Sequence, residues 1–239
     1  MPRNPRCVIP GLAHHVTQRG VDRMDVFYHQ GDRETYLNLV RSNLKDAGVR
    51  VVAWCAMTNH VHWVVVPEQE DSLQVMYRRS QGRYAQYLNA RRGRTGHLWE
   101  RRFHSCVVDP AMEDIVLRYV EWNPVRAGMV GRPEEYAWSS AAAHLAGPGS
   151  EAVELIDWEY WRKREQAEGW RELLELGLSG EQERAVRRAT YAGAPLGGKE
   201  FVERIEKQTG RKWHKRGRPK KAGGKAEAVA MPCATFSEV

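Results

Sequence analysis

The stretch VRVVAWCAMTNHVHWVVV, residues 49–66, decides the fold of this chain. Its two halves, 49–57 and 60–66, are rich in β-branched and aromatic residues, which favour strands. Thr58 and Asn59 separate the halves and predict a hairpin turn. The stretch therefore predicts two strands that pair antiparallel.

The sequence on either side of this hairpin continues the pattern of strands and helices. Alternating residues predict strands, while apolar residues at helical spacing, such as those between Asp32, a candidate N-cap, and Gly48, predict helices. The predicted elements in chain order are strand 13–19, helix 32–47, strands 49–57 and 60–66, helix 71–91, strand 103–108 and helix 110–122. The order βαββαβ with one added helix predicts an α+β fold of the ferredoxin-like type, an antiparallel sheet with helices on one face.

The composition changes where GPGS, residues 147–150, predicts a linker. We expect residues 1–146 to form the main domain and residues 147–210 to form a small helical extension. Residues 211–239 are rich in Lys, Arg and Gly, and we expect them to be disordered without a partner. The helices predicted for the extension are 157–169, 180–191 and 198–209.

The charge of the chain is concentrated in two basic blocks. The whole chain carries a net charge of +7, from 37 Lys and Arg against 30 Asp and Glu. Residues 211–225 contribute +8 and residues 76–102 contribute +7, which leaves −8 for everything else. Two such blocks on an acidic body point to a polyanion, most simply nucleic acid. The alternative is that the arginines of the first block only solvate a surface.

Several classes of protein are excluded by what the sequence lacks. The longest strongly apolar stretch, residues 63–67, is far shorter than the roughly 20 residues of a membrane-spanning helix. The N-terminus shows no secretory signal, so we expect a cytoplasmic, nucleoid-associated protein. Cys7, Cys55, Cys106 and Cys233 stand singly, which indicates neither a zinc ribbon nor a disulfide framework.

His60 and His62 are the first candidates for chemistry. Residues two apart on a strand project to the same face, so both imidazoles could offer a nitrogen to one divalent ion. Val61 between them would face the core. The alternative interpretation is an incidental pair. We expect five other histidines to be structural and not metal ligands: His14, His15, His97, His104 and His144.

Tyr119 and Asn123 are the second pair of candidates. They lie four residues apart on a predicted helix, so they share one face. A phenol there could attack a phosphodiester, and the Asn123 carbonyl oxygen could be a third metal ligand. The alternatives are that Tyr119 is a half-buried core residue and that Pro124 forces Asn123 into an extended conformation.

Four stretches together resemble a known family. MTNHVHWVVVP (57–67), FHSCVV (103–108), LRYVEWNPVRAGMV (117–130) and EYAWSS (135–140) resemble the HUH single-tyrosine transposases, most closely the REP-associated tyrosine transposases. The resemblance covers residues 10–145 and, more loosely, LGGKEFVERIEKQTGR at 196–211.

The resemblance implies a metal-dependent enzyme that cleaves and rejoins single-stranded DNA near short hairpins. It implies that His60, His62 and Asn123 hold Mg²⁺ or Mn²⁺, and that Tyr119 attacks phosphorus to form a 5′-phosphotyrosine. Joining through such a bond needs no ATP, which agrees with the absence of a GxxxxGK[ST] motif. Two alternatives stay open: a catalytically silent, regulatory DNA-binding relative, and a metal-dependent hydrolase that does not use Tyr119. Either a monomer or a homodimer is expected.

The basic blocks supply the candidate DNA contacts. The RGRPKK stretch resembles an AT-hook core, in which glycine lets the backbone lie deep in the minor groove, although a generic polybasic tail is the alternative. Arg19 is a phosphate candidate by its position in the family. The remaining predicted contacts are Arg78, Arg79, Arg83, Arg101 and Arg102 in the first block and Arg216, Gly217, Arg218 and Lys220 in the tail.

Overall fold

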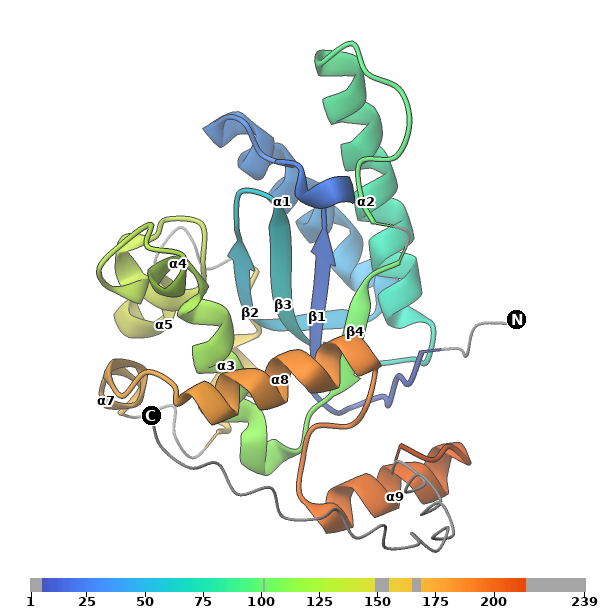
Figure 1. The fold of residues 1–239 in the computed structure, drawn as a ribbon, viewed down its shortest axis with the longest axis vertical. Helices are drawn as coiled ribbons and strands as arrows, with labels where there is room; N and C mark the ends of the chain where they lie inside the picture. The colour runs from blue at the N-terminus through green and yellow to red at the C-terminus, as the bar shows by residue number, and fades with distance from the viewer. Residues whose placement is uncertain (1–5, 101, 149–154, 165–168, 214–239) are drawn as a thin grey trace, which may run out of the picture.

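A four-stranded antiparallel sheet lies at the centre of the computed structural model, which describes residues 6–100, 102–148, 155–164 and 169–213 (Figure 1). The strand order is β2-β3-β1-β4. The strands are β1 (His14–Arg19), β2 (Val49–Ala56), β3 (His60–Pro67) and β4 (His104–Val107). This order, with one helix after β1 and one after β3, confirms the predicted βαββαβ arrangement of an α+β fold.

The predicted hairpin is formed by β2 and β3. Trp54 pairs with Trp63 and Cys55 with His62, and a register shift between Val51 and Ala53 marks a bulge in β2. The turn is tied to β1 because the Gly20 amide donates to the Asn59 carbonyl. The hairpin turn is therefore fixed beside the end of β1.

Helices α1 (Gln30–Ala47) and α2 (Ser72–Arg91) cover one face of the sheet, as predicted. The aromatic side chains of Tyr36, Trp63 and Tyr84 fill the core between them. Helix α1 begins two residues earlier than predicted, and Asp32 is not its N-cap. Its Oδ2 instead accepts hydrogen bonds from the amides of residues 28 and 29, one turn before it.

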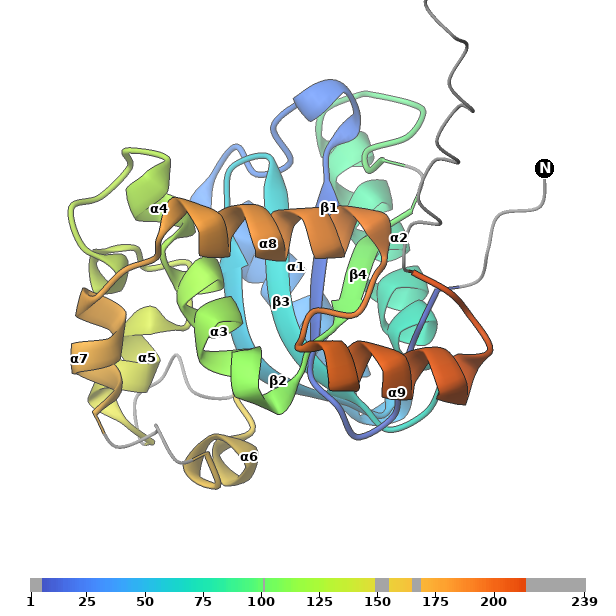
Figure 2. The ribbon, with the colours of Figure 1, turned by 60° about the horizontal axis from the view of Figure 1, so that its bottom comes forward.

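The opposite face of the sheet is also covered, by α3 (Glu113–Glu121) and α8 (Gly180–Ala192) (Figure 2). Val64, Cys106, Val116 and Val186 belong to one hydrophobic cluster there. The C-terminal helices therefore share a core with the sheet. The domain boundaries predicted from composition remain predictions.

The chain stays helical through Pro124. Helix α3 ends at Glu121, and the short helix α4 (Asn123–Arg126) follows with proline in its first turn, where a missing amide costs nothing. Asn123 is consequently helical and not extended.

A buried carboxylate joins α3 to the segments that follow it. Glu121 accepts hydrogen bonds from the side chains of Ser140, His144 and Trp170. Trp170 opens a helix that was not predicted, and the helix predicted over 157–169 is described only as Trp158–Arg162. The remaining helices are 3₁₀ turns at Val21–Arg23, Pro110–Met112 and Pro133–Glu135, with α5 (Ala141–Ala146), α6 (Trp158–Arg162), α7 (Trp170–Glu175) and α9 (Lys199–Thr209).

Across the described segments, every helix is too short or too polar to cross a bilayer. Arg101 lies outside the described residues, as do the predicted tail contacts Arg216, Gly217, Arg218 and Lys220.

Candidate active site

The two histidines of β3 lie on the sheet face covered by α3 and α8. Their ring centroids are 4.9 Å apart, and Val61 between them packs into the cluster on the α1/α2 face, as the alternation predicts. His62 is buried and His60 is half-buried. The strand therefore presents both imidazoles to one side.

Tyr119 reaches the same place from α3. Its ring centroid lies 5.8 Å from that of His62 and 5.4 Å from that of His15, in edge-on orientations. The side chain is 8% exposed. The structure thus brings Tyr119 beside His62, although 57 positions separate them in the sequence.

His15 was expected to be structural only, and the structure contradicts this. Its Nε2 lies 2.9 Å from Nδ1 of His62, and its Nδ1 lies 2.7 Å from the Thr190 hydroxyl oxygen on α8. The two imidazole rings are stacked, 5.1 Å apart and nearly parallel. His15 is therefore a partner of His62.

One placement of the protons satisfies all of these contacts at once. The Thr190 hydroxyl donates to the Val186 carbonyl, so its oxygen is free to accept from His15 Nδ1–H. His15 Nε2 is then an acceptor, and His62 must donate to it from Nδ1. The lone pair of His62 consequently lies on Nε2.

A separate contact gives His60 the same tautomer. Asn59 donates its amide N–H to the Arg23 carbonyl, which turns the Asn59 oxygen towards His60 Nδ1 at 2.6 Å. His60 therefore donates from Nδ1 and keeps its lone pair on Nε2. Metal-binding histidines in proteins use this arrangement, with one ring nitrogen held by an acceptor and the other left for the ion.

The electrostatic environment keeps both rings neutral. Burial, together with the charges of Arg19 and Arg126, lowers the pKa of His60 to about 3. Burial also holds the pKa of His62 well below its ordinary value, with the neighbouring His60 and His15 adding to this effect. Neutral imidazoles are the form that binds metal ions. The two histidines thus fit a divalent ion, although the described residues include no group of three or more His, Cys, Asp or Glu side chains arranged to hold one.

Asn123, the predicted third ligand, is engaged elsewhere in this structure. Its Nδ2 donates to the carbonyls of Tyr119 and Val120, and its Oδ1 accepts a hydrogen bond from Arg126 at 2.9 Å. An amide oxygen held this way must leave Arg126 before it binds an ion.

Arg126 is a site residue that was not singled out from the sequence. Its guanidinium carbon lies 4.2 Å from the centroid of the Tyr119 ring, and its Nη2 donates to the Tyr119 carbonyl. Burial raises the pKa of Tyr119, while the positive charges of Arg126 and Arg187 oppose the rise. Its position in RYVEWNPVRAG, seven residues or about two helical turns after the tyrosine, was the available signal.

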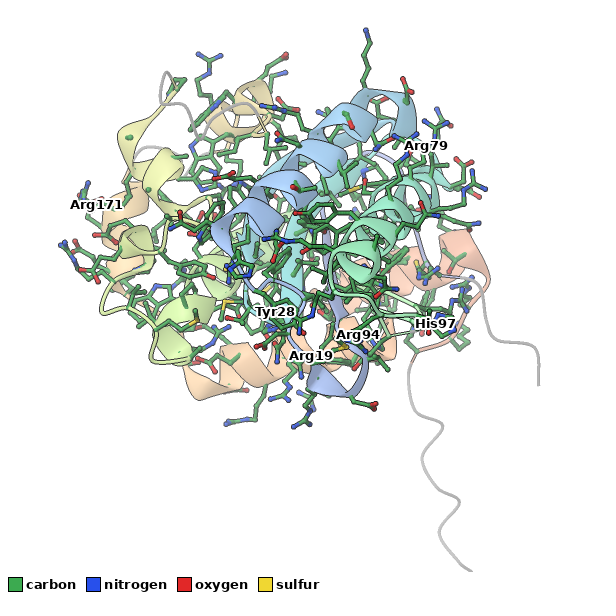
Figure 3. The ribbon with its side chains drawn as sticks, turned by 90° about the horizontal axis from the view of Figure 1, so that it is seen from above. Arg19, Tyr28, Arg79, Arg94, His97 and Arg171 are labelled. Carbon is green, nitrogen blue, oxygen red and sulfur yellow. The ribbon has the colours of Figure 1, made fainter. Side chains whose placement is uncertain are left out.

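Arg19 lies at the edge of the histidine pair. It pairs with His60 in the sheet register, and its charge lowers the pKa of both His60 and His62. Its Nε is buried without a hydrogen-bond partner among the described residues. Figure 3 shows Arg19 near Arg94, and the two belong to segments joined by the bridge between Gly20 and Trp99.

The predicted arginines of the first basic block are spread over the surface. Arg78, Arg79 and Arg83 are exposed on α2, on the far side of the sheet from Tyr119, and Arg79 forms an ion pair with Asp46 at 3.2 Å. Arg102 lies beside Arg6 next to β4. These residues do not surround Tyr119, so any role in DNA binding concerns more distant parts of a substrate.

Solved structures of known proteins resemble the fold of this chain. A solved structure of a REP-associated tyrosine transposase bound to a REP hairpin is similar, with a TM-score of 0.53 and 18% identity over 61% of this chain and 86% of that chain. A transposase candidate from Deinococcus radiodurans R1 shows 17% identity over 50% of this chain and 96% of that chain, and its TM-score of 0.36 is too low to bear on the fold. No curated protein sequence matches the chain significantly.

The family model is more informative than these likenesses. The model described as "Transposase IS200 like" matches residues 9–123, a range that holds all four strands, both histidines of β3 and Tyr119. Over this range, just under half of the chain, the sequence is similar to the IS200-like transposase family.

Proposed function

We propose that this protein cleaves and rejoins single-stranded DNA through Tyr119, in a reaction that depends on Mg²⁺ or Mn²⁺ and passes through a 5′-phosphotyrosine. The observation that carries the proposal is the position of Tyr119, 5.8 Å between ring centroids from a histidine whose Nε2 is left unprotonated. A nucleophile and a metal-binding pair are the two parts that such chemistry needs.

His60 and His62 would hold the ion through their Nε2 atoms. The bound ion would draw negative charge from the nonbridging oxygens of the scissile phosphate. Asn123 would become a third ligand after its oxygen leaves Arg126, and water and phosphate oxygens would complete the set. Arg19, with its unpartnered Nε beside His60, would bind a phosphate oxygen.

Tyr119 would attack as the phenolate. The phenol loses its proton to solvent, and the guanidinium of Arg126 over the ring stabilises the anion. The phenolate oxygen bonds to phosphorus while the bond from phosphorus to the 3′ oxygen breaks, and the leaving oxygen takes up a proton as a 3′-hydroxyl. A 3′-hydroxyl that later attacks the phosphotyrosine reverses these bond changes and joins two strands without ATP.

We infer that the substrate carries a short DNA hairpin of the REP type. The support is the bound REP hairpin in the similar solved structure, together with the similarity of the chain to the IS200-like transposase family. A hairpin places a duplex next to an unpaired segment, so a protein that binds both holds the cleavage site at a fixed position.

Labelled hairpin oligonucleotides test the proposal. A strand labelled at its 3′ end is incubated with protein and Mn²⁺ or Mg²⁺, and we expect the label to move with the protein on a denaturing gel. A strand labelled at its 5′ end should instead release a shorter DNA with a 3′-hydroxyl. Tyr119→Phe and omission of metal should each abolish both products.

Two outcomes would contradict the proposal. Cleavage that survives Tyr119→Phe would indicate a metal-dependent hydrolase in which water is the nucleophile. Binding without cleavage, across several hairpins and both ions, would indicate a catalytically silent DNA-binding relative.

A further inference from the structure

Three adjoining hollows lie along α8 and β4, outside the cluster of His60, His62 and Tyr119. The first, of about 440 Å³, is lined by three arginines of α8 and by Tyr191. The second, of about 700 Å³, shares Tyr191 with the first and extends to Arg102 and Trp213. The third, of about 350 Å³, shares Arg102 with the second and extends to Arg78 on α2. We call these three hollows the α8–β4 track.

Positive charge dominates the track. Among its lining residues the single acid is Glu100. Arg6 and Arg102 lie close enough that the charge of Arg102, after burial, helps to lower the pKa of Arg6 to about 10. The basic residues of the track are Arg6, Arg78, Arg102, Arg184, Arg187, Arg188, Arg211 and Lys212.

Most of this charge is not neutralised within the described residues. Lys212 pairs with Glu206 at 3.4 Å, but Arg6, Arg102 and Arg188 form no ion pair with any described carboxylate. Like charges held together without an acidic partner repel each other, so the track favours an anionic ligand.

The track also contains hydrogen-bond acceptors without partners. Gln18 is 7% exposed and its Oε1 has no partner, while its Nε2 is fixed by donation to the Glu100 carbonyl. Ser105, 5% exposed, also has an unpartnered side-chain oxygen. Phosphate oxygens only accept hydrogen bonds, so they cannot pair with the Gln18 oxygen. A donor such as the exocyclic amino group of a base can.

Aromatic side chains stand between the charged positions. Tyr191 is 44% exposed and lies where the first and second hollows meet, next to the ring of His104 at 4.7 Å. Trp213 lines the far side of the second hollow. Unpaired bases stack on such rings without regard to sequence.

The track connects Tyr119 to the end of the described chain. On the Tyr119 side, Arg126, whose guanidinium lies over the Tyr119 ring, pairs at 3.9 Å with Glu183, one helical turn before Arg187 on α8, so the first hollow adjoins the candidate active site. At the other end, Trp213 is the last described residue, and the basic RGRPKK stretch begins three residues later. The family match ends at residue 123, so α8 lies beyond it.

We propose that the α8–β4 track binds the unpaired DNA strand next to the cleavage site, with its phosphates on the arginines and its bases on Tyr191 and the Gln18 oxygen. A single strand alone offers all three features at once, since a duplex hides its base faces in the stack. This inference rests on the proposed function for its substrate class and adds to it a place where that substrate lies.

Binding measurements in the Tyr119→Phe background, without metal, test the inference independently of cleavage. The variant Arg102→Gln/Arg188→Gln removes two track charges, and Arg162→Gln/Arg171→Gln on α6 and α7 is the matched control. Arg171 lines a separate hollow that shares no residue with the track, and it lies at the left of Figure 3, away from His97 at the right. Fluorescence anisotropy with a labelled unpaired oligonucleotide gives affinity as a function of salt.

We expect each lost phosphate contact to weaken single-strand binding about fivefold at 0.1 M salt, and to reduce the slope of log K against log salt by about 0.7. The double variant should therefore bind about 25-fold more weakly than the control, with unchanged thermal melting. Tyr191→Ala should cost about tenfold with an unchanged slope, since stacking is not an ionic interaction.

Equal affinities and slopes for the double variant and its control would overturn the inference. So would a stronger effect of the double variant on duplex DNA, or on an acidic peptide, than on the single strand. The two proposals can also fail separately. If the double variant loses single-strand binding, but the protein with Tyr119 intact does not cleave hairpin DNA in the presence of metal, the proposed function is refuted and the inference about the track stands.

Discussion

Replacement of Thr190 by valine is expected to weaken metal binding at a site that Thr190 does not touch. The hydroxyl oxygen accepts from His15 Nδ1, and His15 Nε2 in turn accepts from His62 Nδ1. Valine has nearly the same shape but no acceptor. Without an acceptor at position 190, His15 can place its proton on Nε2, and His62 can no longer donate to that atom.

The size of the effect follows from these contacts. Loss of a hydrogen-bond partner of a metal-binding histidine reduces metal affinity by roughly 10- to 100-fold, or about 1.4 to 2.7 kcal/mol. Where His15 instead keeps its proton on Nδ1, burying that N–H without a partner costs about 1 to 3 kcal/mol of unfolding free energy. Thr190→Ser keeps the hydroxyl and should stay within about threefold of the parent affinity.

Two measurements check this prediction. Titration calorimetry with Mn²⁺ gives the affinity, and ¹H–¹⁵N spectra of the metal-free protein report which nitrogen of His62 carries the proton. We expect Nδ1–H in the parent protein and in Thr190→Ser, and a mixture in Thr190→Val. A parent spectrum showing His62 protonated at Nε2, or equal Mn²⁺ affinity in all three proteins, would refute the reasoning.

Three further predictions concern other parts of the structure. Burial lowers the pKa of His14 to about 4, and its Nε2 accepts a hydrogen bond from the Ile9 amide. In the unfolded chain this pKa is about 6.5, so below that pH the unfolded state binds a proton that the folded state does not. Stability should therefore fall by about 2 kcal/mol from pH 7 to 5 on this account, and denaturant unfolding should show a smaller fall in His14→Gln. Glu121→Ala leaves three buried donors without their acceptor and should lower the unfolding free energy by about 3 kcal/mol; a thermal melt shifted by less than about 2 °C would argue against this anchoring role. Arg126→Gln removes a charge that opposes the raised pKa of Tyr119, so it should raise this pKa further and slow single-turnover cleavage roughly tenfold at pH 7. Arg126→Lys should retain more of the rate, and equal rates in all three proteins would rule out stabilisation of the phenolate.

Local patterns were sufficient for the centre of the fold and for part of the site. Strand alternation placed His60 and His62 on one face and Val61 in the core, and helical spacing placed Tyr119 on α3. Such features depend on neighbours within a few residues, which a sequence displays directly.

The missed features depend on contacts between distant segments. His15 meets His62 because β1 and β3 are adjacent in the sheet, and it meets Thr190 across 175 positions of sequence. No local pattern encodes the packing of α8 on this face. At Pro124 the alternative offered by a local rule, an extended Asn123, is wrong, because the proline fits the first turn of α4.

The central claim is that the oxygen of Tyr119 becomes joined to the 5′ end of cleaved DNA. Arg118 and Arg126 flank a tryptic peptide, residues 119–126, that contains this tyrosine and no other. The protein is incubated with a hairpin oligonucleotide and Mn²⁺, digested with nuclease and trypsin, and analysed by tandem mass spectrometry. The account predicts this peptide with a 5′-deoxynucleotide on Tyr119, and an adduct on another residue, or cleaved DNA without any adduct, would contradict it.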